Sequence, residues 1–285
     1  MPRTDNRPNP LVMAVSAMLV ALVVIVFARL AYGLLLPAMR TDLGLSYRQA
    51  GALGTVTALG YLLFVLLGGL AASRWGARNT VVFGLAAVTL GFAGLAVAGD
   101  YPLIVVLMAL LGFGTAFCFA PTVSLLATWY PERRGVMIGC MTAGVGAGIF
   151  FIGLLVPWLS DLFGANGWRV TWGIFAAVAG AVGLLVLLAV RDPPTADDAG
   201  TARPPSADKW LIYRNPRVII MALVYGIIGM VYITQALFMV SYVVESGFDE
   251  TIAGWLMAMM GLLSVLSGPL WGSLSDSWGR GNTLS

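Results

Sequence analysis

The sequence predicts an all-α polytopic membrane protein, and three observations support this prediction. Of the 285 residues, 59% are hydrophobic and only 10% are charged, whereas a soluble domain carries roughly 25% charged residues. Eight apolar runs are each long enough to form a helix that crosses the bilayer core, which takes about 20 residues. One helix and its exit loop occur twice, which is typical of transporters built from internal repeats.

The eight apolar runs predict eight spanning helices joined mostly by short connections. They cover residues 11–36, 50–71, 80–98, 102–128, 136–158, 170–190, 217–243 and 252–271. The first run is too long for the apolar region of a signal peptide and has no cleavage pattern. Tryptophans lie near predicted span ends, where interfacial aromatic residues are expected; they are Trp129, Trp158, Trp168, Trp172 and Trp271.

Loop charges predict the orientation. With a cytoplasmic N-terminus, the inside segments hold twelve Lys and Arg residues and the outside loops hold three. Positive charge accumulates on the cytoplasmic side, so we expect a multi-pass inner-membrane protein with its N-terminus inside.

A polar stretch after the sixth run predicts the domain organisation. Residues 191–216 contain two Pro-Pro pairs and an Asp-Asp pair. We expect an N-terminal six-helix bundle in residues 1–190, a cytoplasmic linker in 191–216 and a partial second bundle in 217–285.

The repeated stretch reads GLAASRWGARNT from Gly69 to Thr80 and GSLSDSWGRGNT from Gly272 to Thr283. The same offset of 203 positions places Ala50-Gly51 on Ala253-Gly254. Seven identities share this offset, which indicates an internal duplication.

These motifs resemble the major facilitator superfamily. The segment Gly272–Arg280, GSLSDSWGR, matches the loop motif of that family. Further similar segments are Leu43–Gly51, Gly60-Tyr61, Trp129–Gly135 and Gly167–Arg169. The segment Phe27–Pro37, FARLAYGLLLP, is similar to the uncharacterised bacterial YbfB/YjiJ-like branch. The resemblance implies secondary active transport by alternating access between two six-helix bundles in a bacterial inner membrane.

The resemblance also implies twelve spanning helices, of which eight are present here. We therefore expect a fragment, an interrupted gene or a truncated product. A truncated, non-transporting membrane protein remains an alternative function, as does a drug or metabolite efflux transporter. Efflux is disfavoured because Met108 and Leu111 stand where drug–proton antiporters carry Arg and Gln.

Arg29 is the only charged residue predicted to lie well inside a span. A buried arginine costs at least roughly 2.5–3.5 kcal/mol on insertion scales, so it usually faces a cavity or a partner. We expect it to bind an anionic solute such as a carboxylate. Alternatively, it snorkels outward or bonds to backbone carbonyls. An offset of 206, from Asn9-Pro10 to Asn215-Pro216, pairs Arg29 with Gln235. The candidate substrate-binding residues are Arg29, Tyr32, Tyr61, Tyr232 and Gln235.

The two loop copies supply candidate gating residues. They are Gly69, Ser73, Arg74, Gly76, Arg78, Gly272, Asp276, Gly279 and Arg280. The resemblance implies that the acidic residue pairs across the bundles and helps to lock the outward-facing state. The first copy departs from the pattern because Ser73 replaces the acid and Ala77 the first base. Its latch is therefore expected to be weak or to use a hydroxyl cap.

Several function classes are excluded or disfavoured. The chain has no His and two Cys in apolar runs, so we expect no metal site and no cofactor. No nucleophile–base pair or phosphate loop indicates an enzyme, and the scattered bases indicate no nucleic-acid binding. The expected partners are the lipid bilayer, a small solute for which an anion is the first guess, and a coupling ion for which a proton is the candidate.

Overall fold

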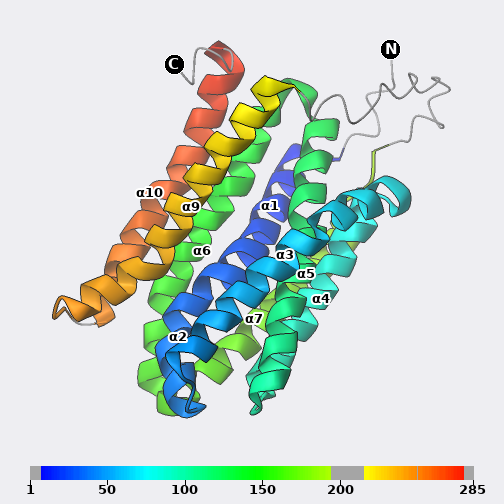
Figure 1. The fold of residues 1–285 in the computed structure, drawn as a ribbon. Helices are drawn as coiled ribbons and strands as arrows, with labels where there is room; N and C mark the ends of the chain where they lie inside the picture. Colours follow the sequence, from blue (N-terminus) through cyan, green and yellow to red (C-terminus); the bar gives the residue numbers. More distant parts are fainter. Residues whose placement is uncertain (1–7, 194–214, 249, 279–285) are drawn as a thin grey trace. The chain divides into compact units, whose positions relative to one another are not determined.

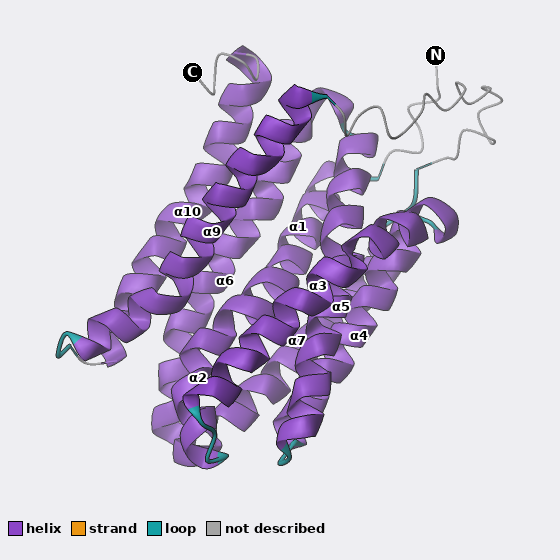
Figure 2. Ribbon diagram, viewed as in Figure 1, coloured by secondary structure: helices purple, strands orange, loops and turns teal. Residues whose placement is uncertain are grey.

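The computed structural model describes residues 8–193, 215–248 and 250–278 (Figure 1). The chain forms two compact units by its internal contacts, residues 1–192 with 254–285 and residues 193–253. In the described part of the chain, Figure 2 shows helices joined by loops and turns.

Each predicted apolar run coincides with a helical segment, as the fold class requires. The first segment is continuous and comprises α1 (Pro10–Ala21), the π-helix η2 (Leu22–Leu30) and α2 (Ala31–Asp42). The others are α3 (Tyr47–Trp75), α4 (Ala77–Val97), α5 (Tyr101–Trp129), α6 (Arg134–Phe163), α7 (Gly167–Ala189), α9 (Pro216–Glu245) and α10 (Glu250–Trp278), with 3₁₀ turns at Pro131–Arg133 and Gly164–Asn166.

Six apolar stretches of the described chain are long enough to cross a membrane by length and composition. One of them, Pro131–Ala189, contains both α6 and α7. A shorter apolar stretch, Val218–Val231, lies within α9. Within the first unit, consecutive helices are in contact, α4 with α5 and α6 with α7 among them.

The ends of α3 show how the sequence sets helix boundaries. The Ser46 hydroxyl accepts a hydrogen bond from the Gln49 backbone N–H at 3.2 Å, and the Gln49 side chain accepts one from the Ser46 N–H at 2.9 Å. This capping box satisfies two backbone donors at the start of α3. The helix ends at Gly76, whose φ of +87° strongly favours glycine.

The π-helical stretch η2 lies in the middle of the first membrane-length helix. The Ala31 N–H bonds to the Val26 carbonyl five residues back, and the Thr115 hydroxyl of α5 donates to the Val24 carbonyl at 3.2 Å. A π-turn accommodates one more residue than an α-turn and is frequent at functional sites. The stretch therefore changes the direction of the side chains within it and after it, and Arg29 lies in its last turn.

The interior of the first unit contains an aromatic cluster. Phe27 of η2 stacks on Phe175 of α7 with ring centroids 3.9 Å apart, and Phe92 and Trp172 pack beside them at 5.5–5.8 Å. Trp172 and Trp168 are fully buried. The sequence placed both among the interfacial tryptophans, but their rings fill the core between helices.

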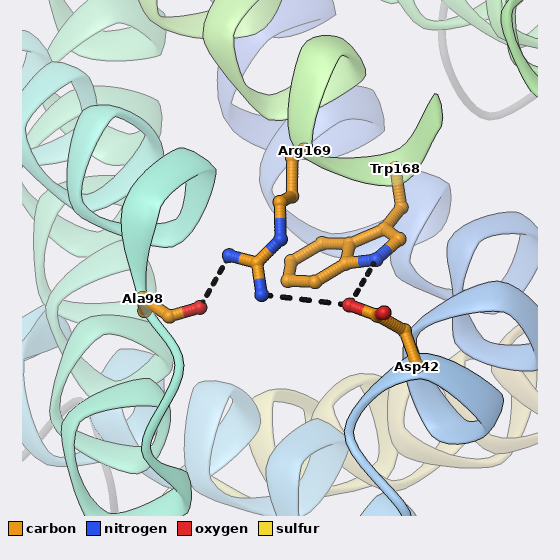
Figure 3. A network of polar contacts seen from close by, with 4 residues as sticks. All are labelled: Asp42, Ala98, Trp168 and Arg169. Atoms are coloured by element: carbon orange, nitrogen blue, oxygen red, sulfur yellow. Dashed lines mark hydrogen bonds and ion pairs between the residues drawn. The ribbon is translucent and has the colours of Figure 1, made fainter. Parts of the chain in front are cut away.

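A polar network joins the end of α2, the end of α4 and the start of α7 (Figure 3). Asp42, at the end of α2, accepts hydrogen bonds from the Trp168 indole at 3.2 Å and from Arg169 at 3.4 Å. Arg169 also donates to the carbonyl of Ala98 at 2.6 Å, and its guanidinium lies 4.2 Å from the Trp168 ring centroid. Arg169 therefore ties α7 to the ends of α2 and α4.

Replacing Arg169 by Ala should lower the free energy of unfolding by about 1–3 kcal/mol. The substitution removes the charge-assisted bond to Asp42 and leaves the Ala98 carbonyl without the donor that Arg169 supplies. Thermal unfolding in detergent measures this loss. Arg48→Ala, at an exposed position, is the control. Equal melting temperatures for the two variants would show that the network contributes nothing.

Candidate functional site

Arg29 and Tyr61 are brought together from two helices. Arg29 lies in the last turn of η2 and is partly buried, and its guanidinium carbon is 5.0 Å from the centroid of the Tyr61 ring of α3. A guanidinium over an aromatic face is held by the ring quadrupole. This pair is the part of the predicted substrate site that the structure assembles.

Tyr32 is buried, and its hydroxyl donates a hydrogen bond to the Ala50 carbonyl at 2.7 Å. This contact joins α2 to α3 close to the start of α3. The hydroxyl of Tyr32 therefore has a structural partner, in line with the packing alternative for a single membrane tyrosine.

Tyr232 and Gln235 lie on α9, in the second compact unit. Their side chains are outside the part of the chain that the structure describes. Their role in substrate binding stays a prediction.

In the first loop copy, the side chains bond within their own bundle. The Ser73 hydroxyl donates to the Leu70 carbonyl of its own helix at 2.8 Å. Arg74 is exposed at the end of α3, and Gly69 is exposed with no atom within 4 Å of the place that an added Cβ would take. Arg78 donates from its guanidinium to the Leu187 carbonyl of α7.

Asp192 is the functional candidate that the sequence reasoning missed. It accepts a hydrogen bond from the Arg78 backbone N–H at 2.8 Å and thus caps the start of α4, where unpaired N–H groups and the helix dipole favour an anion. A Cβ at Gly76 would collide with this carboxylate. The acid missing at Ser73 is therefore supplied by residue 192, just after α7. The only sequence signal was an acidic residue at the start of the polar linker.

In the second loop copy, Asp276 reaches the N-terminus of α6. Its carboxylate accepts hydrogen bonds from the backbone N–H groups of Gly135 and Val136 at 3.2 and 2.9 Å. Both N–H groups lie in the first turn of α6, which has no intrahelical partner for them. Asp276 therefore joins α10 to α6 by a charge-assisted contact. Gly279 and Arg280 lie outside the described residues.

The helices α6 and α10 approach each other at matched glycines. Facing pairs are Gly135 with Gly272, Gly139 with Gly268, Gly146 with Gly261, and Gly153 with Gly254. Each step along α6 is matched by an equal step backward along α10, so the helices run antiparallel in register. An added Cβ at Gly146 or Gly261 would come within about 2.7 Å of the partner's carbonyl oxygen. Only glycine permits this backbone contact.

Another face of α6 contacts the first helix. A Cβ at Gly144 would collide with the Met18 carbonyl of α1, and one at Gly148 would meet Val26 of η2 at 2.7 Å. These glycines serve close packing. The glycines of α6 therefore allow close contact with two neighbours, the first helical segment (α1 and η2) on one face and α10 on the other.

Within the described residues, no group of three or more His, Cys, Asp or Glu side chains is arranged to hold a metal ion.

Replacing Asp276 by Ala should expose the start of α6, because two backbone N–H groups lose their acceptor at a cost of about 0.5–2 kcal/mol. We expect trypsin to cleave after the exposed Arg133 and Arg134 about three- to tenfold faster. Ser277→Ala is the control, because the Ser277 hydroxyl donates to the Leu274 carbonyl of its own helix. Unchanged cleavage in Asp276→Ala would contradict the contact.

Replacing Gly261 by Ala should weaken the α6–α10 contact by about 1–3 kcal/mol, because the new methyl group has no room against backbone atoms. The matched control is Gly229→Ala in α9, where no atom lies within 4 Å of an added Cβ. There the higher helix propensity of alanine should be neutral or stabilising. Thermal unfolding followed by tryptophan fluorescence compares them, and equal shifts would refute the tight packing.

Comparisons with known proteins agree with this architecture. The Major Facilitator Superfamily profile matches residues 18–285. The human monocarboxylate transporter 11 is 35% identical over 135 residues, which cover 45% of this chain and 28% of the relative. The hexuronate transporter of Bacillus subtilis is 25% identical over 167 residues, covering 58% of this chain and 39% of the relative. The chain thus spans less than half the length of either relative.

Among solved structures, a bacterial homologue of the human lysosomal transporter Spinster, in an inward-facing and unoccupied conformation, superposes with a TM-score of 0.70. It is 18% identical, and the match covers 98% of this chain and 64% of that one. The similarity to known transporters therefore includes the three-dimensional fold. Since the family profile covers nearly the whole chain, the protein belongs to the major facilitator superfamily.

Proposed function

We propose that this protein acts in the secondary active transport of a small organic anion by alternating access. We further propose that it lies in a bacterial cytoplasmic membrane with its N-terminus in the cytoplasm. The observation on which the proposal depends is the position of Arg29, a permanent cation in the middle of an apolar helix and beside the ring of Tyr61.

The chemistry of arginine favours an anionic solute. A guanidinium presents N–H donors in a planar fork that fits a carboxylate with two parallel bonds. In a membrane interior the charge is expensive, so it is kept where it serves a pathway or a partner. Tyr61 contacts the cation through its ring face, and the N–H edge is the part of a guanidinium that recognises a carboxylate.

The π-helical stretch supports the same site. It ends immediately after Arg29, at Leu30, and its wider winding sets the direction of that side chain. The Thr115 hydroxyl of α5 stabilises one of its carbonyls. The names of the two relatives, a monocarboxylate and a hexuronate transporter, agree with a carboxylate as the solute class.

The contact between α6 and α10 supports alternating access. The two helices belong to different bundles in the predicted organisation, and a carboxylate on exposed helix-end N–H groups is a contact that water can replace. The glycine pairs let the helices approach without interlocking side chains. Asp276 can therefore act as a latch that closes the repeated-loop end and releases it again.

The orientation follows from charge. By the sequence prediction, the segments on the side of the repeated loop hold twelve Lys and Arg residues and the segments on the other side hold three, and positive segments stay in the cytoplasm. The latch at Asp276 then lies on the cytoplasmic side, where its closure would favour the outward-facing state.

The decisive experiment measures solute binding to the purified protein in lipid nanodiscs, with short monocarboxylates, hexuronates and neutral sugars as probes. Arg29→Gln should weaken carboxylate binding about 10- to 100-fold, since a charge-assisted bond is worth about 1.5–3 kcal/mol. Arg29→Lys should retain part of the affinity. Proteoliposome uptake of the same solutes then tests transport.

Arg40→Gln is the matched control, because Arg40 also lies over a tyrosine ring, 4.1 Å from the Tyr47 centroid, but near the end of α2. It should bind carboxylates as the unsubstituted protein does. If the folded Arg29→Gln variant binds them equally well, or if neutral sugars bind better than carboxylates, Arg29 is structural and the proposed solute class is wrong.

A further inference from the structure

A small cavity lies inside the first unit, between α1, α4, α5 and α7. Its polar lining residues are Ser16, Arg78 and Thr122, and apolar side chains such as Met13 complete the wall. It is separate from the Arg29–Tyr61 pair, whose residues do not line it. An inference about this cavity does not depend on the proposed transport function.

Two polar atoms of this lining have no hydrogen-bond partner among the described residues. They are Ser16 Oγ and Arg78 Nε, both buried. Ser16 is only 2% exposed. Buried polar groups are almost always satisfied by protein or by ordered water, and here two such groups border the same small space.

The size and chemistry of the cavity fit one water molecule. It leaves about 20 Å³ for the centre of a water-sized sphere, whereas roughly 10–15 Å³ suffices for one water. An internal water makes about three hydrogen bonds. Arg78 Nε is a donor, Ser16 Oγ can donate or accept, and Thr122 Oγ1 retains acceptor capacity because its proton goes to the Cys118 carbonyl at 2.7 Å.

We propose that this cavity is a binding site for a single ordered water that bridges Ser16 of α1 to Arg78 of α4. The bridge completes the bonding of Arg78, which also reaches the Leu187 carbonyl of α7 and, through its backbone, Asp192. Arg78 is then a junction of helices inside the bundle. The small volume of the cavity favours a water over a larger solute. Its mostly apolar lining favours a water over an anion.

The water has a route to solvent. Arg78 and Val190 also line an open hollow on the surface, together with Leu188, Arg191 and Asp192. Movement of the Arg78 side chain would connect the two spaces. The bound water should therefore exchange with bulk water while the bundle stays folded.

Radiolytic footprinting of the full chain in lipid nanodiscs tests the site, because hydroxyl radicals formed from an internal water oxidise the side chains around it. Met13 lines the cavity and is 1% exposed, whereas Met39 is equally buried and does not line it. We expect Met13 to be oxidised at least threefold faster than Met39. Labelling in ¹⁸O water should place ¹⁸O on Met13. Equal rates at the two methionines would overturn the proposal.

Variants of Ser16 supply the control. Ser16→Val removes the hydroxyl and fills the space, and it should lower Met13 oxidation to the rate of Met39, whereas Ser16→Thr should preserve it.

Should Ser16→Val not fold, Ser16→Ala combined with Arg78→Gln gives an independent test. If the water bridges Ser16 and Arg78, Ser16→Ala lowers the melting temperature of the protein that retains Arg78. In the Arg78→Gln background, the same substitution changes the melting temperature little. Additive shifts, or a melting temperature that depends on chloride concentration, would contradict the bridge.

Discussion

The structure depends on backbone-to-backbone contact between helices at glycines. In a membrane there is little hydrophobic force between helices, so association relies on van der Waals contact and hydrogen bonds, which small residues permit. Gly112 of α5 lies directly on α3, with Tyr61 N 2.9 Å from its added Cβ position, and Gly84 and Gly114 bring α4 and α5 together. This closeness holds α3 in place and with it the Tyr61 ring beside Arg29. Without it, the predicted site would not be assembled.

Much of the helical architecture could be predicted, because apolar run length and loop charge are local properties of the sequence. All eight runs form helices, and the capping residues Ser46 and Gln49 mark the start of α3. The π-stretch in the first helix was not predictable from the apolar pattern, since the run around it is almost uniformly apolar and has no polar face whose period would reveal the winding. Likewise, Trp168 and Trp172 sit near helix ends in sequence but are buried in space, because the packing of neighbouring helices decides burial.

The candidate site was only partly predictable, for the same reason. The sequence singled out Arg29 by its charge and Tyr61 by its polarity, and the structure places them together. It could not show that the Tyr32 hydroxyl bonds to Ala50, or that Asp192 supplies the carboxylate absent at Ser73. Those pairings join residues 18 and 114 positions apart, and only the packed fold decides which partner a side chain meets. The acid at Asp276, by contrast, was identified from its motif and contacts a helix N-terminus.

The winding of η2 has a consequence for the comparison of the two sequence halves. Counted from Asn9-Pro10 and Asn215-Pro216, an equal number of residues leads from each start to Arg29 and to Gln235. However, the path to Arg29 passes through a π-stretch, whereas α9 is α-helical throughout. A π-turn takes up one residue more than an α-turn, so equal counts no longer correspond to equal heights and directions. By helical height, the counterpart of Arg29 on α9 therefore precedes Gln235, and an alignment of the halves needs a gap in the α9 half opposite residues 22–30.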